Sequence, residues 1–415
     1  MLQAIQRQFL ITFASMGAVL AYLPVFLEER LASKAQVGWV MSTTGLAIIL
    51  TPVVMTALAD TKLQSRSIIA ALFCVSSLTC FWQAVSEGFV GLLVSHTAFA
   101  FCFWPLAALQ DGLVFADNQQ ARTEGRRETP YHRVRVFGTV GFALPLAALY
   151  FLINAGLDVS SALYVGGGVC ALGAVNALTL PRTALGQARR ARYQAAEHDD
   201  LAPADRFPTR AAARVLFRGT PLIFCACLLV AHLGNSAYYA FYPIYLTRQV
   251  GFDNAWVGPI TMLGVVLELA VMTSVGLMLR RLGLKRLLLV GLGVMVVRFA
   301  LLGLWPVQHV AVWTQILHGI TVVGIYVVPP IYLNTLASDH FRSSIHGLYA
   351  MVVFGPGRIL GNVLGGELAD VSLPILFNIS AATTLLAVIG LALAMRLPKQ
   401  VVEHAEDVPA MVEGD

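Results

Sequence analysis

Long apolar runs separated by short charged clusters make up most of the chain. Each run is close to or longer than the roughly 20 residues that an α-helix needs to cross a bilayer. The runs lie at residues 7–28, 37–59, 67–86, 89–113, 133–154, 160–180, 220–246, 255–279, 284–304, 309–335, 344–367 and 373–396. The pattern predicts an all-α membrane protein with twelve transmembrane helices, numbered here as spans 1 to 12 in chain order.

One long polar segment interrupts this pattern between spans 6 and 7. It covers residues 181–218, carries charges of both signs and separates six spans from six. We expect it to be a partly helical cytoplasmic linker that tethers the two halves. The predicted parts are an N-terminal six-helix bundle (1–180), the linker (181–218), a C-terminal six-helix bundle (219–398) and a cytoplasmic tail (399–415).

The two halves also share sequence features. Pro24 in span 1 recurs as Pro243 at the matching place in span 7. Gly38 at the start of span 2 likewise recurs as Gly258 at the start of span 8. Repeated halves are typical of carriers whose substrate site lies between them near the middle of the membrane. The repeat predicts two pseudo-symmetric bundles.

The composition supports a membrane protein and excludes several other classes. Of the 415 residues, 57% are hydrophobic and 12% are charged, whereas a soluble protein has roughly 25% charged residues. A soluble enzyme, a nucleic-acid-binding protein and a disordered scaffold are therefore excluded. The net charge of +5 is small and indicates no nucleic-acid partner. The expected partner is the lipid bilayer.

The basic residues predict the orientation of the chain. All but five of the 28 Lys and Arg lie at the two termini or in loops on the same side as the termini. The five others are Arg30, Lys34 and Arg248 in opposite loops and Arg298 and Arg358 within spans. Because basic residues concentrate on the cytoplasmic side, both termini are expected in the cytoplasm and the chain in the inner, or plasma, membrane.

Ionisable residues within the C-terminal spans are the main candidates for function. Glu268, Arg298, His318 and Arg358 lie in spans 8, 9, 10 and 11. Charge within hydrocarbon is costly, so such residues need partners, water or a function. We expect one cluster in which Glu268, His318 and Arg298 load and release a proton. The alternatives are a static Glu268–Arg298 ion pair and a hydrogen-bonded core histidine at position 318.

The N-terminal half offers fewer candidates. Asp111 lies near the cytoplasmic part of span 4, and Arg135 lies one turn inside span 5. This acid and base either contact a polar substrate or form a latch between helices. Arg358 in span 11 is a further candidate for substrate binding.

Span 7 contains a dense group of aromatic residues. Tyr238, Tyr239, Tyr242 and Tyr245 fall within eight residues, shortly after Asn235. Aromatic faces with hydroxyl groups suit sugars, nucleobases or aromatic acids. We expect Asn235, Tyr238 and Tyr239 at a substrate site, whereas an outer aromatic girdle accounts for Tyr242 and Tyr245.

The loop between spans 8 and 9 resembles a signature of the major facilitator superfamily. The matching residues are Arg281, Gly283 and Arg286, and the equivalent 2–3 loop keeps Asp60 without the signature glycines. The resemblance implies the major facilitator fold, with these four residues in gating loops.

Several further stretches resemble the lactose-permease-like clan, in particular its phenylpropionate-permease and nucleoside:proton symporter branches. The matching pieces are Pro105-Leu-Ala-Ala-Leu-Gln-Asp111, Arg133-Val-Arg135-Val-Phe-Gly138, Ala237-Tyr238-Tyr239, Glu268, Val297-Arg298-Phe299 and Gln315-Ile-Leu-His318.

This resemblance implies roles for individual residues. Asp111 and Arg135 match the clan's acid–arginine substrate clamp, while Glu268, Arg298 and His318 match its sugar-contact and proton network. Thr321 stands where the sugar permeases carry a proton-carrying carboxylate, three residues beyond the histidine. Proton carriage would then fall to Glu268 with His318, or coupling would be absent.

Taken together, these features predict a secondary active transporter and no enzyme. The expected substrate is a nucleoside, sugar or aromatic acid, moved by alternating access with proton symport. The alternatives are a proton-driven exporter of amphipathic compounds and a membrane-embedded enzyme or sensor. No cofactor and no metal are expected. Because one chain supplies both halves, we expect a functional monomer.

Overall fold

The computed structural model describes residues 2–59, 64–123, 125, 131–180, 208–337 and 341–395. The elements of this part of the chain are helices, as predicted. They form ten continuous segments that are long and apolar enough to cross a membrane. The helices α2 (Lys34–Ala59) and α7 (Ser161–Ala177) occupy the two remaining predicted spans.

The chain divides into two compact units, each described here by itself. The first comprises Met1–Asp199 and Phe252–Met262, and the second comprises Asp200–Gly251 and Leu263–Asp415. The residues 181–207 of the predicted linker and the tail from residue 399 lie outside the described residues.

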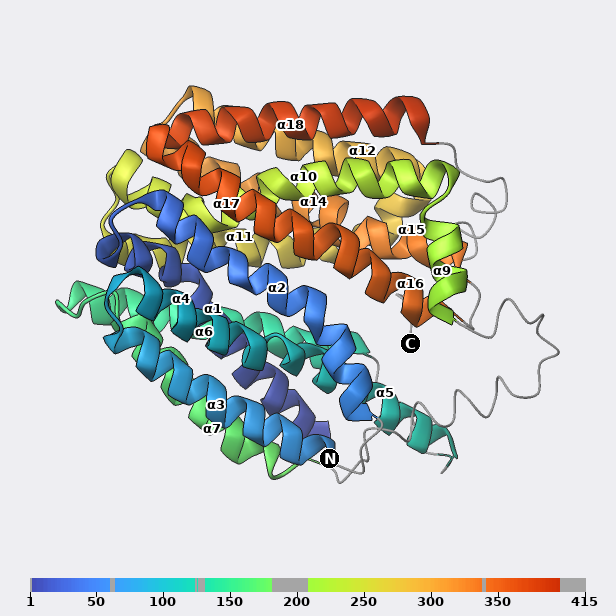
Figure 1. Cartoon of the computed structure of the whole chain (residues 1–415), viewed down its shortest axis with the longest axis horizontal. Coiled ribbons are helices and arrows are strands. Elements are labelled where there is room, and N and C mark those ends of the chain that lie inside the picture. The colour runs from blue at the N-terminus through green and yellow to red at the C-terminus, as the bar shows by residue number, and fades with distance from the viewer. Residues whose placement is uncertain are drawn as a thin grey trace. The chain divides into compact units, whose positions relative to one another are not determined.

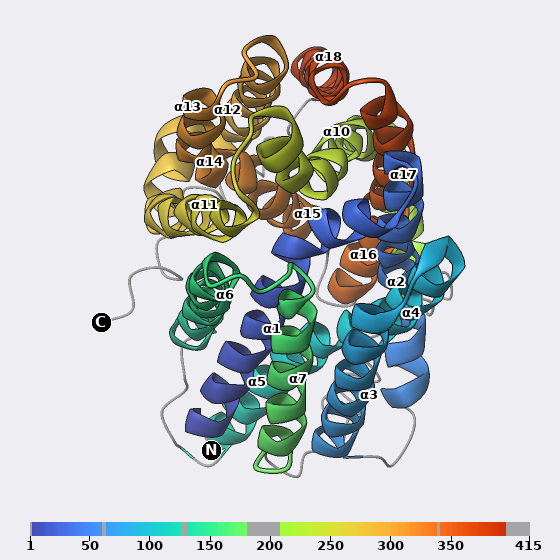
Figure 2. The same cartoon turned by 90° about the vertical axis from the view of Figure 1, so that its left-hand side faces the viewer.

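The first unit is built on α1. Besides α2 and α7 it contains α1 (Leu2–Arg30), α3 (Ser65–Val85), α4 (Gly88–Phe103), α5 (Pro105–Thr123) and α6 (Tyr131–Asn154). Figure 2 shows α1 flanked by α6 and α7, against both of which it packs.

Glycine lets α1 and α6 approach closely. A Cβ atom at Gly141 would lie only 2.1 Å from the carbonyl oxygen of Leu10. Small residues at helix crossings are a common packing device in membranes. The close contact fixes the start of α6, where Arg135 lies.

The second unit begins with the short helix α9 (Pro208–Leu216), which falls within the predicted linker. Its first membrane-crossing segment joins α10 (Gly219–Ile244) to η2 (Tyr245–Gln249), whereas α12 (Val275–Leu304) and α18 (Leu373–Ala394) are single helices. Two further segments are built from several pieces: one from α13 (Gln308–Trp313), η4 (Thr314–Leu317), α14 (His318–Val322), η5 (Val323–Val327) and α15 (Val328–Leu336), the other from α16 (Arg342–Tyr349), η6 (Ala350–Phe354) and α17 (Gly355–Val371). The helix α11 (Val257–Met272), which follows η3 (Asn254–Trp256), begins in the first unit and continues in the second from Leu263.

Packing within the second unit places α10 and α12 at its core. The helix α10 packs against α17 and α18, and α12 packs against α18 and η5. Figure 1 shows α10, α17 and α18 as neighbours. The functional candidates of spans 7, 9 and 10 therefore come from helices that share one core.

Gly283 marks the break between the predicted spans 8 and 9. Its backbone has φ +71°, within the otherwise helical α12. Glycine adopts this left-handed region without a steric penalty, so it can end one helical stretch and begin another. The predicted boundary between residues 279 and 284 is thus a local break inside one assigned helix.

Candidate functional site

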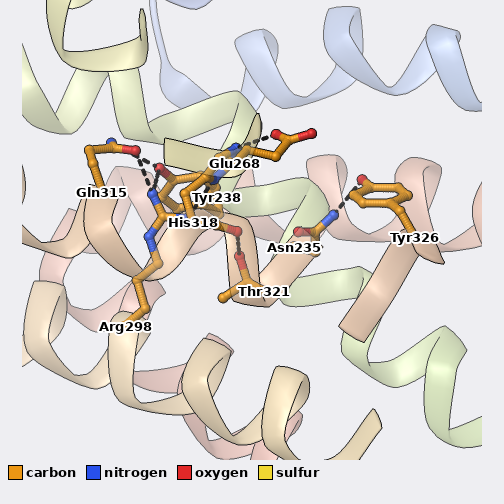
Figure 3. A network of polar contacts seen from close by, with 8 residues as sticks. All are labelled: Asn235, Tyr238, Glu268, Arg298, Gln315, His318, Thr321 and Tyr326. Carbon is orange, nitrogen blue, oxygen red and sulfur yellow. Dashed lines mark hydrogen bonds and ion pairs between the residues drawn. The ribbon is translucent and has the colours of Figure 1, made fainter. Parts of the chain in front are cut away.

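A buried arginine organises a polar network in the second unit (Figure 3). Arg298 on α12 is only 2% exposed. Its guanidinium donates to the hydroxyl of Tyr238, to Oε1 of Gln315 at 2.9 Å and to Nδ1 of His318 at 2.9 Å. The three acceptors come from α10, η4 and α14, so one side chain connects three helical segments with α12.

The Tyr238 ring contributes a second contact to Arg298. The guanidinium carbon lies 4.3 Å from the centre of this ring, within the range of a cation–π interaction. A buried charge needs such compensation because it loses its hydration. The Nε atom of Arg298 has no hydrogen-bond partner in the described part of the chain. The lost hydration of Arg298 is thus compensated by the hydrogen bonds of its Nη1 and Nη2 atoms and by the face of the Tyr238 ring.

The bond to Arg298 determines where His318 carries its proton. A guanidinium can only donate, so Nδ1 of His318 must be the unprotonated acceptor. The proton of the neutral imidazole then lies on Nε2. That nitrogen is 3.4 Å from Oε2 of Glu268. A second proton, on Nδ1, would oppose the donor from Arg298 and break their hydrogen bond.

The network therefore runs from a buried cation through a neutral imidazole to a more accessible acid. The Glu268 side chain is 30% exposed, compared with 9% for the His318 side chain. His318 lies between Arg298 and Glu268, so their predicted cluster forms without a direct Glu268–Arg298 contact. Glu268 is the member of the three that is best placed to exchange a proton.

Glycines bring α11 and the span 10 segments close enough for this contact. A Cβ atom at Gly264 would lie 2.5 Å from Oε1 of Gln315, and one at Gly319 would lie 2.9 Å from the Cα atom of Glu268. His318 begins α14, directly after the short 3₁₀ turn η4. The local sequence thus provides both the close approach and the position of the imidazole.

A second polar pair lies on α10 and η5. The amide nitrogen of Asn235 donates to the hydroxyl of Tyr326 at 2.7 Å (Figure 3). The Tyr326 ring stacks with Phe354 at 5.8 Å between centroids. This pair combines a hydrogen-bonding group with aromatic faces, as expected of a site for a flat polar solute.

Two buried polar side chains in this region were not found by the sequence analysis. His232 lies one turn before Asn235 on α10, and its ring meets Phe354 edge-on at 4.5 Å. Its Nε2 atom has no hydrogen-bond partner among the described residues, and neither has the amide of Asn362 on α17. The one available signal was the spacing of polar residues at positions 232 and 235, three residues apart on one helix.

Arg358 lies in the same region of the second unit. It is half-buried on α17, one turn before Asn362. It acts electrostatically on both His232 and Tyr326. The region around Asn235 therefore contains a cation besides its aromatic and amide groups.

The tyrosines of span 7 have different surroundings from one another. Tyr238 belongs to the Arg298 network, and the half-buried Tyr239 meets the His318 ring edge-on at 6.2 Å. The interpretation of Tyr242 and Tyr245 as an outer girdle is wrong. Both are buried, and their hydroxyls donate to the backbone oxygens of Ala311 and Leu302. They belong to the protein core because these bonds satisfy their polar ends.

The N-terminal candidates lie in the first unit. Arg135 on α6 is exposed, and its guanidinium lies 4.3 Å from the centre of the Phe13 ring. Asp111 is half-buried on α5. The predicted Asp111–Arg135 clamp stays a prediction.

The gating-loop candidates are only partly described. Arg281 and Arg286 are exposed on α12, on either side of the break at Gly283. Asp60 lies outside the described residues. Within the described ranges, no three His, Cys, Asp or Glu side chains are grouped in a way that could hold a metal ion.

Comparison with known proteins relates this chain to membrane transporters. YegT of Escherichia coli (strain K12), whose name associates it with nucleosides, is 27% identical over 365 residues, covering 85% of this chain and 81% of YegT. The nucleoside permease NupG of the same organism is 22% identical over 346 residues, covering 81% of this chain and 80% of NupG.

The solved structures give the same fold. The crystal structure of NupG superimposes with a TM-score of 0.78 at 18% identity, over 96% of this chain and 99% of NupG. This likeness confirms the predicted major facilitator fold. The relatives are transporters and permeases, which supports a transporter in place of an enzyme.

Residues 2–379 match the family described as the MFS_1 like family, which is most of the chain. The family, the relatives and the membrane-length helices agree with one another. The chain therefore belongs to the MFS_1 like family and is a multi-pass membrane protein that transports small solutes as a secondary transporter.

Proposed function

We propose that the chain takes up nucleosides with protons by alternating access, and that Glu268 carries the proton. The observation that carries this proposal is the position of the neutral His318 between Arg298 and Glu268. Arg298 disfavours a second proton on His318, because that proton would occupy the nitrogen that accepts from the guanidinium. Proton binding is thereby left to the partly exposed carboxylate of Glu268.

His318 has a positioning role in this proposal. Its Nε2–H group faces the carboxylate of Glu268, with 3.4 Å between Nε2 and Oε2. Protonation of Glu268 would weaken that contact and free the carboxyl group to turn towards substrate or water. The proton state of Glu268 is thus linked to the rotamer of its own side chain and, through His318, to Arg298.

The substrate class rests on the Asn235 region and on the names of the relatives. A nucleoside presents a flat base and a sugar with hydroxyl groups. The Tyr326 and Phe354 rings can stack on a base, and the amide of Asn235 and the imidazole of His232 can bond its edge or the sugar. Arg358, Tyr239, Asp111 and Arg135 are further proposed substrate contacts, with Tyr238 holding Arg298.

The proposal includes the remaining features predicted from the sequence. Both termini face the cytoplasm across the inner membrane, and the chain acts as a monomer. The loops with Asp60, Arg281, Gly283 and Arg286 control the change between access states. The Gly283 break supports this last role, because a backbone without helical geometry at one position permits bending there.

A proton-flux assay in liposomes tests the proposal. The purified protein is reconstituted with a pH-sensitive dye outside and is exposed in turn to nucleosides, sugars and aromatic acids. We expect alkalinisation outside on addition of nucleosides, with no response from the Glu268→Gln variant. Binding of a nucleoside without proton movement would contradict symport and favour a uniporter. Acidification outside would favour the exporter.

A further inference from the structure

The helix α9 lies at the end of a membrane-crossing helix and runs in a different direction. Figure 1 shows α9 crosswise to α10. The turn between them uses Gly219, whose φ of +56° suits glycine. Since Gly219–Gln249 is long and apolar enough to span the membrane, a crosswise helix at its end lies along the membrane surface.

One face of α9 packs onto the second unit. Ala211, Ala212 and Leu216 are buried, and α9 packs against α16. Contacts within the unit thus satisfy the apolar side of the helix. They also fix the orientation of its opposite side.

The opposite face of α9 carries two arginines, and a third follows in the turn to α10. Arg210 and Arg214 are exposed and lie one turn apart on α9, whereas Arg218 is exposed in the turn, where its extended backbone precedes α10. Phe217 lies in the same turn and is 42% exposed. Within the described ranges no acidic side chain pairs with these three arginines. An interfacial helix with a basic polar face and an apolar aromatic residue is suited to membrane headgroups.

We propose that the exposed face of α9 and the turn after it, with Arg210, Arg214, Phe217 and Arg218, bind the headgroups of anionic phospholipids. Guanidinium groups bind phosphate oxygens through paired hydrogen bonds, and three exposed guanidinium groups suit a negatively charged leaflet. Phe217 enters the boundary between headgroups and acyl chains. Because Arg210 and Arg214 lie on a helix packed against the unit, their backbone is held in place before lipid binds.

Native mass spectrometry of the full chain in detergent tests the site. The fraction of protein that retains phosphatidylglycerol is compared with the fraction that retains zwitterionic phosphatidylcholine, with and without inorganic phosphate. We expect a preference for phosphatidylglycerol that millimolar phosphate does not abolish. Equal retention of both lipids would overturn the proposal. Complete competition by phosphate would overturn lipid as the ligand and leave a phosphate site.

Matched variants locate the binding to α9. Each single Arg→Gln change at positions 210, 214 and 218 is expected to weaken phosphatidylglycerol binding by about fivefold, and the triple variant by more. The Arg210→Lys, Arg214→Lys and Arg218→Lys triple keeps the charge and is expected to retain most of the binding. Unchanged binding in the triple Gln variant would overturn the proposal.

A second triple variant separates location from total charge. Arg280→Gln, Arg281→Gln and Arg286→Gln remove the same number of exposed charges from α12. Their effect on phosphatidylglycerol binding is expected to be clearly smaller, and an equal effect would overturn the assignment to α9. Thermal unfolding is measured for every variant to identify any that misfold. If a triple variant does not fold, the single variants test the proposal in its place.

Discussion

Arg298 and His318 are joined by a hydrogen bond of 2.9 Å in which the guanidinium donates and Nδ1 of the imidazole accepts. This bond fixes the histidine tautomer and directs Nε2–H towards Glu268. The arginine and the acid thus influence one another through a ring that keeps one proton. A lysine in place of Arg298 could bond only one or two of the same acceptors, since it lacks the planar fork.

The carboxylate of Glu268 is expected to be essential for coupling and dispensable for folding. Because its side chain is partly exposed, the Glu268→Gln variant should fold and keep its thermal stability. It should bind nucleoside but fail to accumulate it against a gradient. Counterflow, which needs no net proton movement, is the matched control and should persist. Uphill uptake by this variant would remove Glu268 from the coupling role.

The second prediction concerns the stability that Arg298 provides. Replacing it by Gln removes donors to Tyr238 and His318 within a buried site, which should cost about 3 kcal/mol. The expected result is a clearly lower melting temperature in detergent. The exposed Arg286→Gln variant is the control and should change stability by less than about 0.5 kcal/mol. Equal melting temperatures for the two variants would show that the network is not stabilising.

Arg135 is expected to act on affinity and not on stability. It is exposed on α6, with its guanidinium over the Phe13 ring. The Arg135→Ala variant should weaken nucleoside binding at least about tenfold, which corresponds to roughly 1.4 kcal/mol, at nearly constant melting temperature. Binding is measured by calorimetry on detergent-solubilised protein. A large loss of stability at unchanged affinity would instead favour a latch between helices.

Tyr245 offers a test of its core location. Its hydroxyl donates to the Leu302 oxygen at 2.8 Å, and its side chain is fully buried. The Tyr245→Phe change should therefore destabilise the protein by about 1 kcal/mol, the usual net value of one hydrogen bond. The Tyr164→Phe change on the exposed face of α7 is the control. Identical unfolding of both variants would return Tyr245 to a membrane-interface role.

The length of the apolar runs and the charged residues within them were the features from which the helices and the polar cluster could be predicted. Apolar runs determine helices in a bilayer, because the backbone must satisfy its own hydrogen bonds there. The same argument predicted that Glu268, Arg298 and His318 would lie together. It could not predict that His318 lies in the middle, because the rotation of each helix depends on packing such as that at Gly264 and Gly319.

The errors and omissions have physical reasons too. Buried aromatic residues and those of an interfacial girdle are of the same types, so the sequence alone does not distinguish them. The prediction that Tyr242 and Tyr245 form an outer girdle was wrong for this reason. Only the structure shows that backbone oxygens of Ala311 and Leu302 satisfy their hydroxyls. His232 and Asn362 were missed because single polar residues within apolar runs usually form ordinary core contacts. Their unpartnered atoms become visible only with neighbouring helices in place.

Among the described residues, the segments η2, η5 and η6 are π-helical: η2 ends span 7, and η5 and η6 interrupt spans 10 and 11. A π turn holds one residue more than an α turn, so it changes the angular position of every side chain beyond it. Migration of this extra residue by one position would twist the part of the span beyond it about the helix axis. Side chains on that part could then exchange hydrogen-bond partners through rotation about the helix axis, without any tilt of the whole helix.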